Sequence, residues 1–200
     1  MNKHINDYIN NINLENITWL NLNSSELKEF LEENYLDKEK WEYVLDKSKD
    51  TIYPVLLGMN YLNIYSHINN KSSNFFLGVV NNNIGKKTII SAIIYLEEYY
   101  MFTNQNIPLT YISTIEVNSY FRNKGIYKKS CKALLNLLNY DQHILISKQS
   151  EMGKKCKVFE IFKETALNKG FKNQILEDNY SINTKEFQDI ICSKTKVLKK

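Results

Sequence analysis

The sequence contains few cysteines, prolines and glycines: its 200 residues include three, two and six of them, respectively. Cys131, Cys156 and Cys192 are widely spaced, and no CxxC pair occurs. None of the three histidines stands near a cysteine at a spacing typical of metal ligands. This pattern argues against a disulfide framework and against a structural zinc site. We therefore expect reduced thiols and no metal cofactor.

Long apolar segments are also missing. No apolar run approaches the roughly 18 residues of a membrane-spanning helix, and the first residues, MNKHINDYINN, contain no hydrophobic signal segment. The net charge of +4 is too small to indicate a nucleic-acid-binding face. These features predict a cytoplasmic protein that binds neither a membrane nor nucleic acid. With 43% hydrophobic residues the chain is too apolar to be disordered.

The apolar pattern predicts one mixed α/β domain at residues 16–193, with a polar arm at 1–15 and a basic tail at 194–200. Near the N-terminus, Ile17–Leu22 reads as a strand. Asn23 stands three residues before Glu26, a capping-box pattern that predicts the start of a helix. A second helix is predicted after Asp37, and the segment Thr51–Asn70 is compatible with a helix or a strand.

The middle of the chain predicts a β-hairpin and a further strand. Asn74–Val80 and Lys87–Glu97 are apolar, β-prone runs joined by a turn rich in Asn and Gly. Tyr99–Leu109, which contains Pro108, reads as a connection to the strand Thr110–Val117.

The rest of the chain alternates between helices and strands. After a polar loop, Tyr127, Cys131, Leu134 and Leu138 recur at helical spacing. The expected elements beyond this helix are a strand at His143–Ser147, a polar connection at Lys148–Gly153, a helix at Lys154–Lys169 that Gly170 ends, and a last strand at Phe187–Cys192.

The loop at Asn118–Gly125 carries the strongest functional signal. It joins a β-rich run to the N-terminus of an amphipathic helix, where the first amides lack partners and the helix dipole is positive. Arg122 and Lys124 add formal charge, and Gly125 lets the backbone approach a ligand closely. Such an arrangement is typical of a site for a phosphorylated cofactor.

These residues resemble a known family. The run from Val117 to Tyr127, VNSYFRNKGIY, resembles the acetyl-CoA loop of the GNAT N-acetyltransferase superfamily. Lys169-Gly170-Phe171, which closes the second helix, resembles the family's Leu-Gly-Phe landmark. The resemblance covers roughly Asn74 to Phe171.

The resemblance implies a GNAT-like fold, a twisted mixed sheet whose fourth and fifth strands splay apart, here with additional N-terminal helices. It implies acetyl-CoA, or another acyl-CoA, as co-substrate and an acyl transfer to a primary amine of a small molecule or a protein. A homodimer is possible. By position in the motif, the implied cofactor-binding residues are Ile115, Val117, Arg122, Asn123, Lys124, Gly125, Ile126, Tyr127 and Lys128.

The sequence lacks the family's usual catalytic residues at the matching positions. The tyrosine that family members use as general acid falls on Ala166, and the strand carboxylates of the family fall on Tyr111 and Ser113. Simple alternation places Glu116 on the opposite face of the strand from these two residues. Glu116 and Tyr127 remain the candidate catalytic residues, with Glu97, Glu98 and Glu151 as alternative carboxylates.

Two further functions stay open. The missing carboxylates and tyrosine are compatible with a catalytically inactive GNAT-fold module that binds CoA or regulates another protein. An unrelated nucleotide-phosphate binder is a weaker reading, because the chain has neither a Walker-type Gly-Lys-Ser/Thr nor a Gly-x-Gly-x-x-Gly motif.

Overall fold

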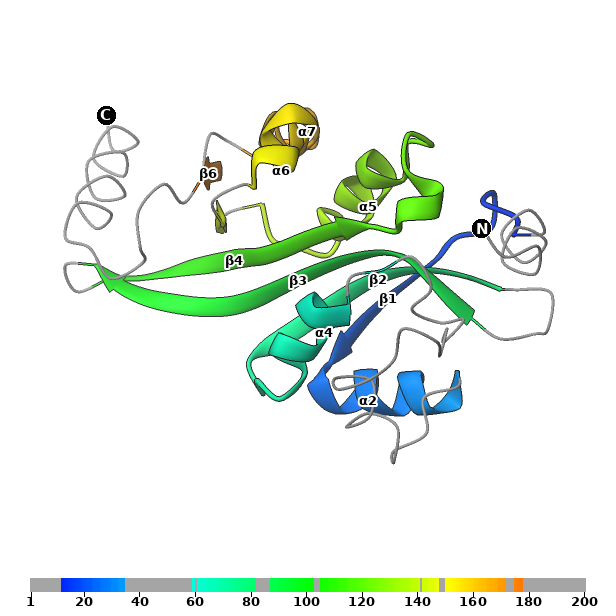
Figure 1. Ribbon diagram of the computed structural model, residues 1–200. Helices are drawn as coiled ribbons and strands as arrows, with labels where there is room; N and C mark the ends of the chain where they lie inside the picture. The colour runs from blue at the N-terminus through cyan, green and yellow to red at the C-terminus, as the bar shows by residue number, and fades with distance from the viewer. Residues whose placement is uncertain are drawn as a thin grey trace.

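The computed structural model describes residues 12–34, 59, 61–81, 87–102, 105–140, 142–147, 150–171 and 175–177. These residues form a six-stranded mixed sheet with helices on both faces (Figure 1). The strands follow one another in sequence order: β1 (Thr18–Asn23), β2 (Ser73–Asn81), β3 (Lys87–Phe102), β4 (Gln105–Val117), β5 (His143–Ile146) and β6 (Ile175–Glu177). Strands β1 to β4 pair antiparallel, whereas β5 and β6 join in parallel.

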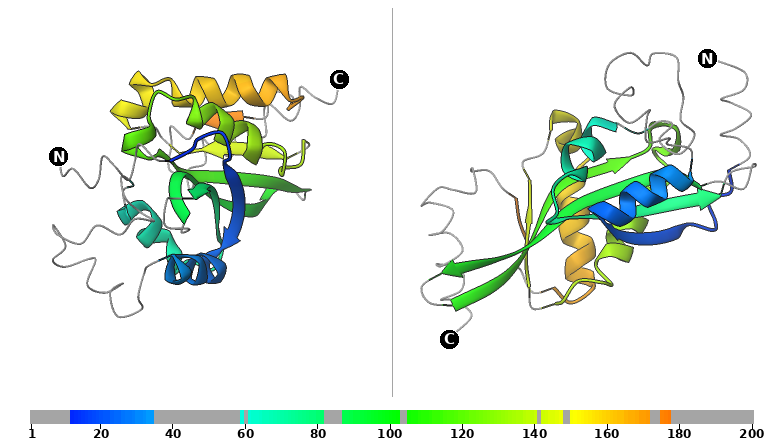
Figure 2. Two further views of the ribbon diagram at one scale, coloured as in Figure 1. Left: turned by 90° about the vertical axis from the view of Figure 1, so that its right-hand side faces the viewer. Right: turned by 90° about the horizontal axis from the view of Figure 1, so that it is seen from below.

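The helices divide between the two faces of the sheet (Figure 2). Helices α2 (Ser24–Glu33) and α4 (Tyr61–Ile68) cover one face, and α5 (Ile126–Leu134), α6 (Glu151–Lys155) and α7 (Val158–Asn168) lie over the other. A short 3-10 helix, η1 (Ser119–Phe121), follows β4. None of the helices in the described ranges is long and apolar enough to span a membrane.

The predicted N-terminal strand and capping box are confirmed. The Asn23 side chain accepts hydrogen bonds from the amides of Ser25 and Glu26, and the Glu26 carboxylate accepts one from the Asn23 amide at 2.8 Å. The ambiguous segment before Asn70 contains helix α4. The helix predicted after Asp37 lies outside the described residues.

The predicted hairpin is confirmed, but its second half is longer than expected. The segment Tyr99–Leu109 is not a connection, because β3 continues to Phe102 and β4 begins at Gln105, with Tyr99 opposite Pro108. Proline is tolerated there because pairing with β5 begins only at Leu109, so that among the described strands Pro108 has a neighbour on one side alone.

A β-bulge at Ser113 changes the direction of the side chains along β4. Thr114 lies opposite Ile94 and Ile112 lies opposite Tyr95, so Ser113 is an extra residue on β4. Glu116 lies opposite Ala92, and both Ala92 and Ile94 belong to the core beneath α2 and α4.

The bulge corrects one prediction. Tyr111 lies opposite Leu96, which points to the same face as Ile94 two residues earlier on β3. Tyr111 and Glu116 therefore share the face covered by α2 and α4, and the expectation that they lie on opposite faces was wrong. The extra residue between them inverts the alternation.

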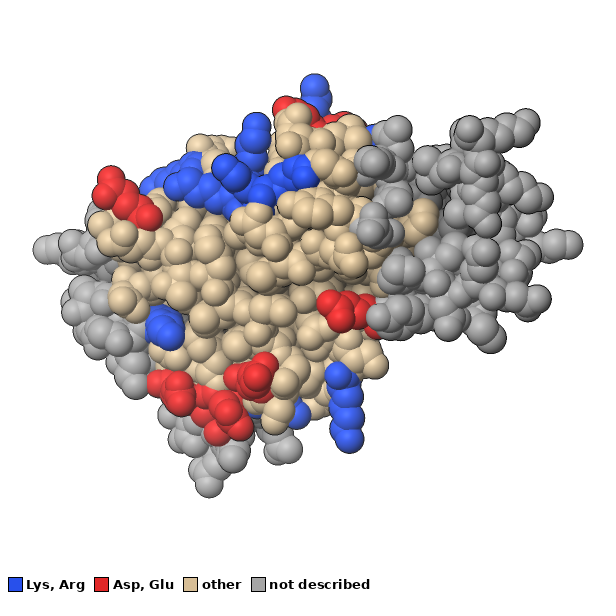
Figure 3. Space-filling model, turned by 180° about the vertical axis from the view of Figure 1, so that it is seen from behind, with Lys and Arg blue, Asp and Glu red and all other residues tan. Residues whose placement is uncertain are grey.

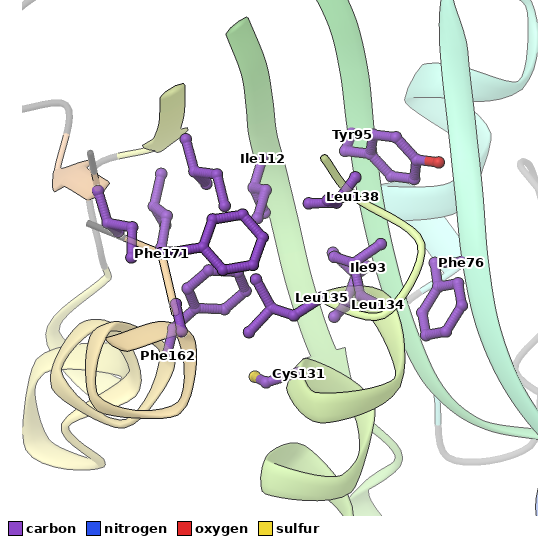
Figure 4. Close-up of a cluster of buried hydrophobic side chains, with 14 residues drawn as sticks. Phe76, Ile93, Tyr95, Ile112, Cys131, Leu134, Leu135, Leu138, Phe162 and Phe171 are labelled. Atoms are coloured by element: carbon purple, nitrogen blue, oxygen red, sulfur yellow. The ribbon is translucent and has the colours of Figure 1, made fainter. Parts of the chain in front are cut away.

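The core on the other face joins the sheet to α5 and α7. Figure 4 shows buried side chains of β3 and β4, such as Ile93 and Ile112, pointing toward Leu134 and Leu135 of the α5 region and Phe162 of α7. Cys131, Leu134 and Leu138 are buried, which confirms most of the predicted apolar stripe, although α5 ends at Leu134.

The predicted second helix is two helices. Lys157 adopts a left-handed conformation with φ of 53°, which separates α6 from α7. Gly170, with φ of 97°, ends α7 as predicted, and the Phe171 amide bonds back to the Ala166 carbonyl at 3.1 Å in a Schellman motif. The strand expected at Phe187–Cys192 lies outside the described residues.

Candidate functional site

The loop between β4 and α5 is anchored by a buried asparagine. The Asn118 side chain donates to the Ile89 carbonyl at 2.9 Å and accepts from the Tyr120 amide at 3.1 Å, and its own amide bonds to the Ile90 carbonyl at 2.9 Å. These bonds fix the loop to β3. The sequence pattern did not single out Asn118; its position directly after an apolar strand was the available signal.

The backbone then turns sharply into α5. Asn123 and Gly125 both have positive φ, 63° and 70°, and Gly125 is the N-cap residue without any side-chain cap. Among the described residues, no acceptor is found for the amides of Ile126, Tyr127 and Lys128, the first three of the helix. This helix terminus presents unpaired N–H groups and positive dipole charge to a ligand.

Basic side chains surround this terminus. Arg122 lies on the loop surface, where its Nε donates to the Val117 carbonyl at 3.3 Å, and the Nζ atom of Lys124 lies 5.7 Å from the centre of the Phe121 ring. Figure 3 shows a band of Lys and Arg side chains on this side of the molecule. The exposed cations of the loop and α5 are Arg122, Lys124, Lys128, Lys129 and Lys132.

Tyr127 turns inward, away from the loop. Its hydroxyl donates to the Val158 carbonyl at 2.6 Å, and its ring packs against the core shared with α7. Burial raises the pKa of Tyr127 well above its ordinary value, with a smaller contribution from the neighbouring Cys131. The large residue at this position therefore leaves the surface at the start of α5 unobstructed.

Among the described residues the end of β4 has no strand partner on one side, where the Val117 carbonyl accepts its hydrogen bond from the Arg122 side chain. The Asn118 amide points to β3, so by alternation the backbone groups of Ile115 and Val117 point away from β3. On that side, β4 and β5 pair only from Leu109 to Ile112, and no described strand pairs with β4 beyond the bulge. The two strands thus part from each other next to the loop.

Ser147 lies where the strands part. Its amide bonds to the Ile112 carbonyl at 2.8 Å, and its hydroxyl donates to the Ser113 carbonyl at 2.8 Å. The Ser113 hydroxyl points the other way and donates to the Ile94 carbonyl at 3.1 Å. Ser147 was expected only as the last residue of a strand, and nothing in the sequence pattern distinguished its hydroxyl.

The carboxylates named from the sequence are dispersed. Glu116 is half-buried on the α2/α4 face of β4, whereas Glu97 on β3 and Glu151 at the start of α6 are exposed. The Glu98 side chain lies outside the described part. Ala166 is fully buried in the α5–α7 core, so no polar group is supplied from that position. Among the described residues no cluster of His, Cys, Asp or Glu is placed to hold a metal ion.

No protein-family model and no curated protein matches the sequence. Solved structures similar to the chain include an aminoglycoside acetyltransferase from an uncultured soil metagenomic sample, with 14% identity, a TM-score of 0.44 and coverage of 74% of this chain and 86% of that one. A ribosomal-protein-alanine N-acetyltransferase from Brucella melitensis biovar Abortus 2308 has 12% identity, a TM-score of 0.45 and coverage of 72% and 90%. The AtaT toxin, bound to the C-terminus of the antitoxin AtaR and acetyl-CoA, has 10% identity, a TM-score of 0.42 and coverage of 70% and 81%. Similarities at this level carry no argument about activity or substrate.

Proposed function

We propose that the protein is an acyl-CoA-dependent N-acetyltransferase of the GNAT type. The observation that carries this proposal is the placement of amides without described acceptors at Ile126–Lys128 beside the end of β4, where no described strand pairs with Ile115 and Val117 on the β5 side. A ligand with a diphosphate followed by an extended chain of amides needs both features side by side: the helix terminus for the diphosphate and the edge of β4 for the amides. The surrounding exposed cations match the anionic character of a CoA thioester.

In this proposal different residues bind different parts of the cofactor. The amides from Arg122 to Lys128 bind the diphosphate, with Arg122, Lys124 and Lys128 adding positive charge. The backbone of Ile115 and Val117 pairs with the pantetheine amides, as an added strand would, and the Arg122 side chain leaves the Val117 carbonyl to contact the diphosphate. Gly125 permits the left-handed turn that brings these amides together.

Acyl transfer from a thioester to an amine needs few catalytic groups once the two substrates are held in position. A primary amine with a pKa of about 10.4 must lose a proton before it attacks the thioester carbonyl, and a thiol with a pKa of about 8.5 leaves readily as the thiolate. A general base therefore matters more than a general acid. Glu116 is the proposed base, since it is the half-buried carboxylate on the strand beside the cofactor; it stands three residues, or about 10 Å, along β4 from Ser113, so it takes the proton through bridging water.

A second candidate function is a CoA-binding module without catalysis. It is favoured by Ala166, whose buried methyl group stands where the family's tyrosine is expected. Acyl transfer and simple binding make the same demands on the loop, so only turnover separates them.

The first experiment is thermal denaturation with increasing acetyl-CoA. At 100 times Kd the ligand adds about 2.7 kcal/mol to the free energy of unfolding, and we expect a corresponding rise in Tm. An unchanged Tm at millimolar acetyl-CoA would contradict both candidate functions. Release of free CoA in the presence of a panel of small amines and peptides then distinguishes the enzyme from the binding module.

A further inference from the structure

We infer that the Ser147 hydroxyl binds the acyl carbonyl oxygen of the thioester, and so marks the acyl end of the proposed cofactor site. The inference rests on the proposed function and goes beyond it, because neither the motif at Gly125 nor the carboxylates of β4 identify a group that contacts the reacting carbonyl. Two observations support it: the place of Ser147 beside Ser113 of β4, and the hydrogen bond that its hydroxyl makes.

The place of Ser147 follows from strand geometry. The diphosphate site lies just beyond Val117, and the point where β4 and β5 part lies at Ser113, four residues earlier on β4. At about 3.3 Å per residue this separation is about 13 Å. We place the sulfur of an extended pantetheine arm, which runs along Ile115 and Val117 from the loop, close to Ser113 and Ser147.

The hydrogen bond of Ser147 is one that a ligand can replace. The hydroxyl donates to the Ser113 carbonyl across the gap between the strands at 2.8 Å, while the Ser147 amide holds the main chain on Ile112. A pantetheine N–H can take over the Ser113 carbonyl in the manner of an added strand. The Ser147 hydroxyl is then available to donate to the thioester carbonyl, and every polar group keeps a partner.

The expected chemical role is stabilisation of developing charge. When the amine nitrogen bonds to the carbonyl carbon, the oxygen gains negative charge. The oxygen then re-forms the C=O double bond as the C–S bond breaks, and the electron pair of that bond leaves with sulfur as the thiolate. The proton of the amine goes to the general base. A hydroxyl donor at the oxygen stabilises the charged intermediate more than the ground state.

The test compares two ligands that differ only in the acyl group. Dissociation constants for acetyl-CoA and for CoA are measured by calorimetry on the full chain, with the wild type and with Ser147→Ala. We expect Ser147→Ala to weaken acetyl-CoA binding by about 2- to 10-fold, as loss of one hydrogen bond does, and not to weaken CoA binding, because CoA has no acyl carbonyl for the hydroxyl to contact. Ser147→Thr keeps a hydroxyl and should bind acetyl-CoA like the wild type.

The matched control is Ser150→Ala. Ser150 is an exposed serine three residues later, whose hydroxyl caps α6 by accepting from the Gly153 amide at 3.1 Å. Its substitution should alter neither constant. If Ser147→Ala leaves acetyl-CoA binding unchanged, or weakens acetyl-CoA and CoA equally, the inference is overturned while the proposed function stands. If the wild type binds neither ligand, the proposed function fails and this inference fails with it.

Discussion

The hydroxyl of Tyr127 donates a hydrogen bond to the carbonyl oxygen of Val158 over 2.6 Å, and this bond joins the first turn of α5 to the first turn of α7. Both helices pack on the same face of the sheet, and the loop before α5 carries the proposed diphosphate site. The bond therefore links the position of the helix terminus to the core. This geometry favours a structural role for Tyr127 over a catalytic one.

Replacement of Tyr127 by phenylalanine tests this role. The change keeps the ring and removes one hydrogen bond to the Val158 carbonyl, which still accepts the intrahelical bond of α7, so the expected cost is about 0.5–1.5 kcal/mol. We expect Tm to fall by a few degrees while acetyl-CoA affinity and turnover change little. Thermal denaturation and CoA-release assays on the variant and the wild type check this. A large loss of turnover at unchanged stability would instead support catalysis by Tyr127.

Two glycines provide a matched pair for the proposed diphosphate site. A Cβ at Gly125 or at Gly170 would meet no atom within 4 Å, and both residues have positive φ, 70° and 97°. A valine at either position therefore causes a similar backbone strain of about 1–2 kcal/mol. We expect Gly125→Val to abolish acetyl-CoA binding and Gly170→Val to preserve it. Equal loss of binding in both variants would show that stability, and not the loop, limits binding.

The buried Asn118 is predicted to hold the loop in place. Asn118→Ala leaves the Ile89 carbonyl and the Tyr120 amide without partners, at a cost of about 2 kcal/mol or more. We expect a Tm lower by about 5 °C or more, and weaker acetyl-CoA binding even at temperatures where the protein is folded. The exposed Asn168→Ala at the end of α7 is the control. Normal binding by folded Asn118→Ala would contradict the anchoring role.

Alkaline pH should destabilise the protein through Cys131. Burial raises the pKa of the Cys131 thiol from 9.0 to about 12. Between these values the unfolded chain loses the proton and the folded chain keeps it. The contribution of the buried thiol to the free energy of unfolding is therefore fully present below pH 9. It is lost as the pH rises toward 12, by at most about 1.4 kcal/mol per pH unit.

Urea denaturation from pH 8 to 11 measures this dependence. In Cys131→Ala the decline above pH 9 should be shallower, while the raised pKa of Tyr127 keeps a residual decline above its ordinary value of 10.0. Cys156→Ala removes an exposed thiol and is the matched control. An identical pH dependence in Cys131→Ala and the wild type would exclude Cys131 as the cause.

Local patterns predicted most of the individual elements. The capping box at Asn23 and the αL position at Gly170 follow from short-range hydrogen bonding and backbone sterics, which depend only on residues close in sequence. The strand that ends in Val117 and the amphipathic helix after Gly125 were predicted from the spacing of apolar residues, which is also a local property of the sequence. The loop at the centre of the proposed site lies between these two elements, so its place in the chain also followed from local patterns.

Long-range pairing decided what the local patterns could not. Residues 99–102 and 105–109 form strands because they lie opposite each other. The proline that suggested a connection carries no information about this distant partner. The bulge at Ser113 depends on how β4 fits against β3, and it alone determines that Tyr111 and Glu116 share a face.

The residue pattern alone was enough to specify most of the elements, their order and the chemical character of the loop around Gly125. The packing of the whole chain was needed to establish that Ser147 meets Ser113 where two strands part, and that Tyr127 points into the core. Both contacts are hydrogen bonds between residues more than thirty positions apart. Such bonds depend on the register and twist of the entire sheet, which no short window of residues contains.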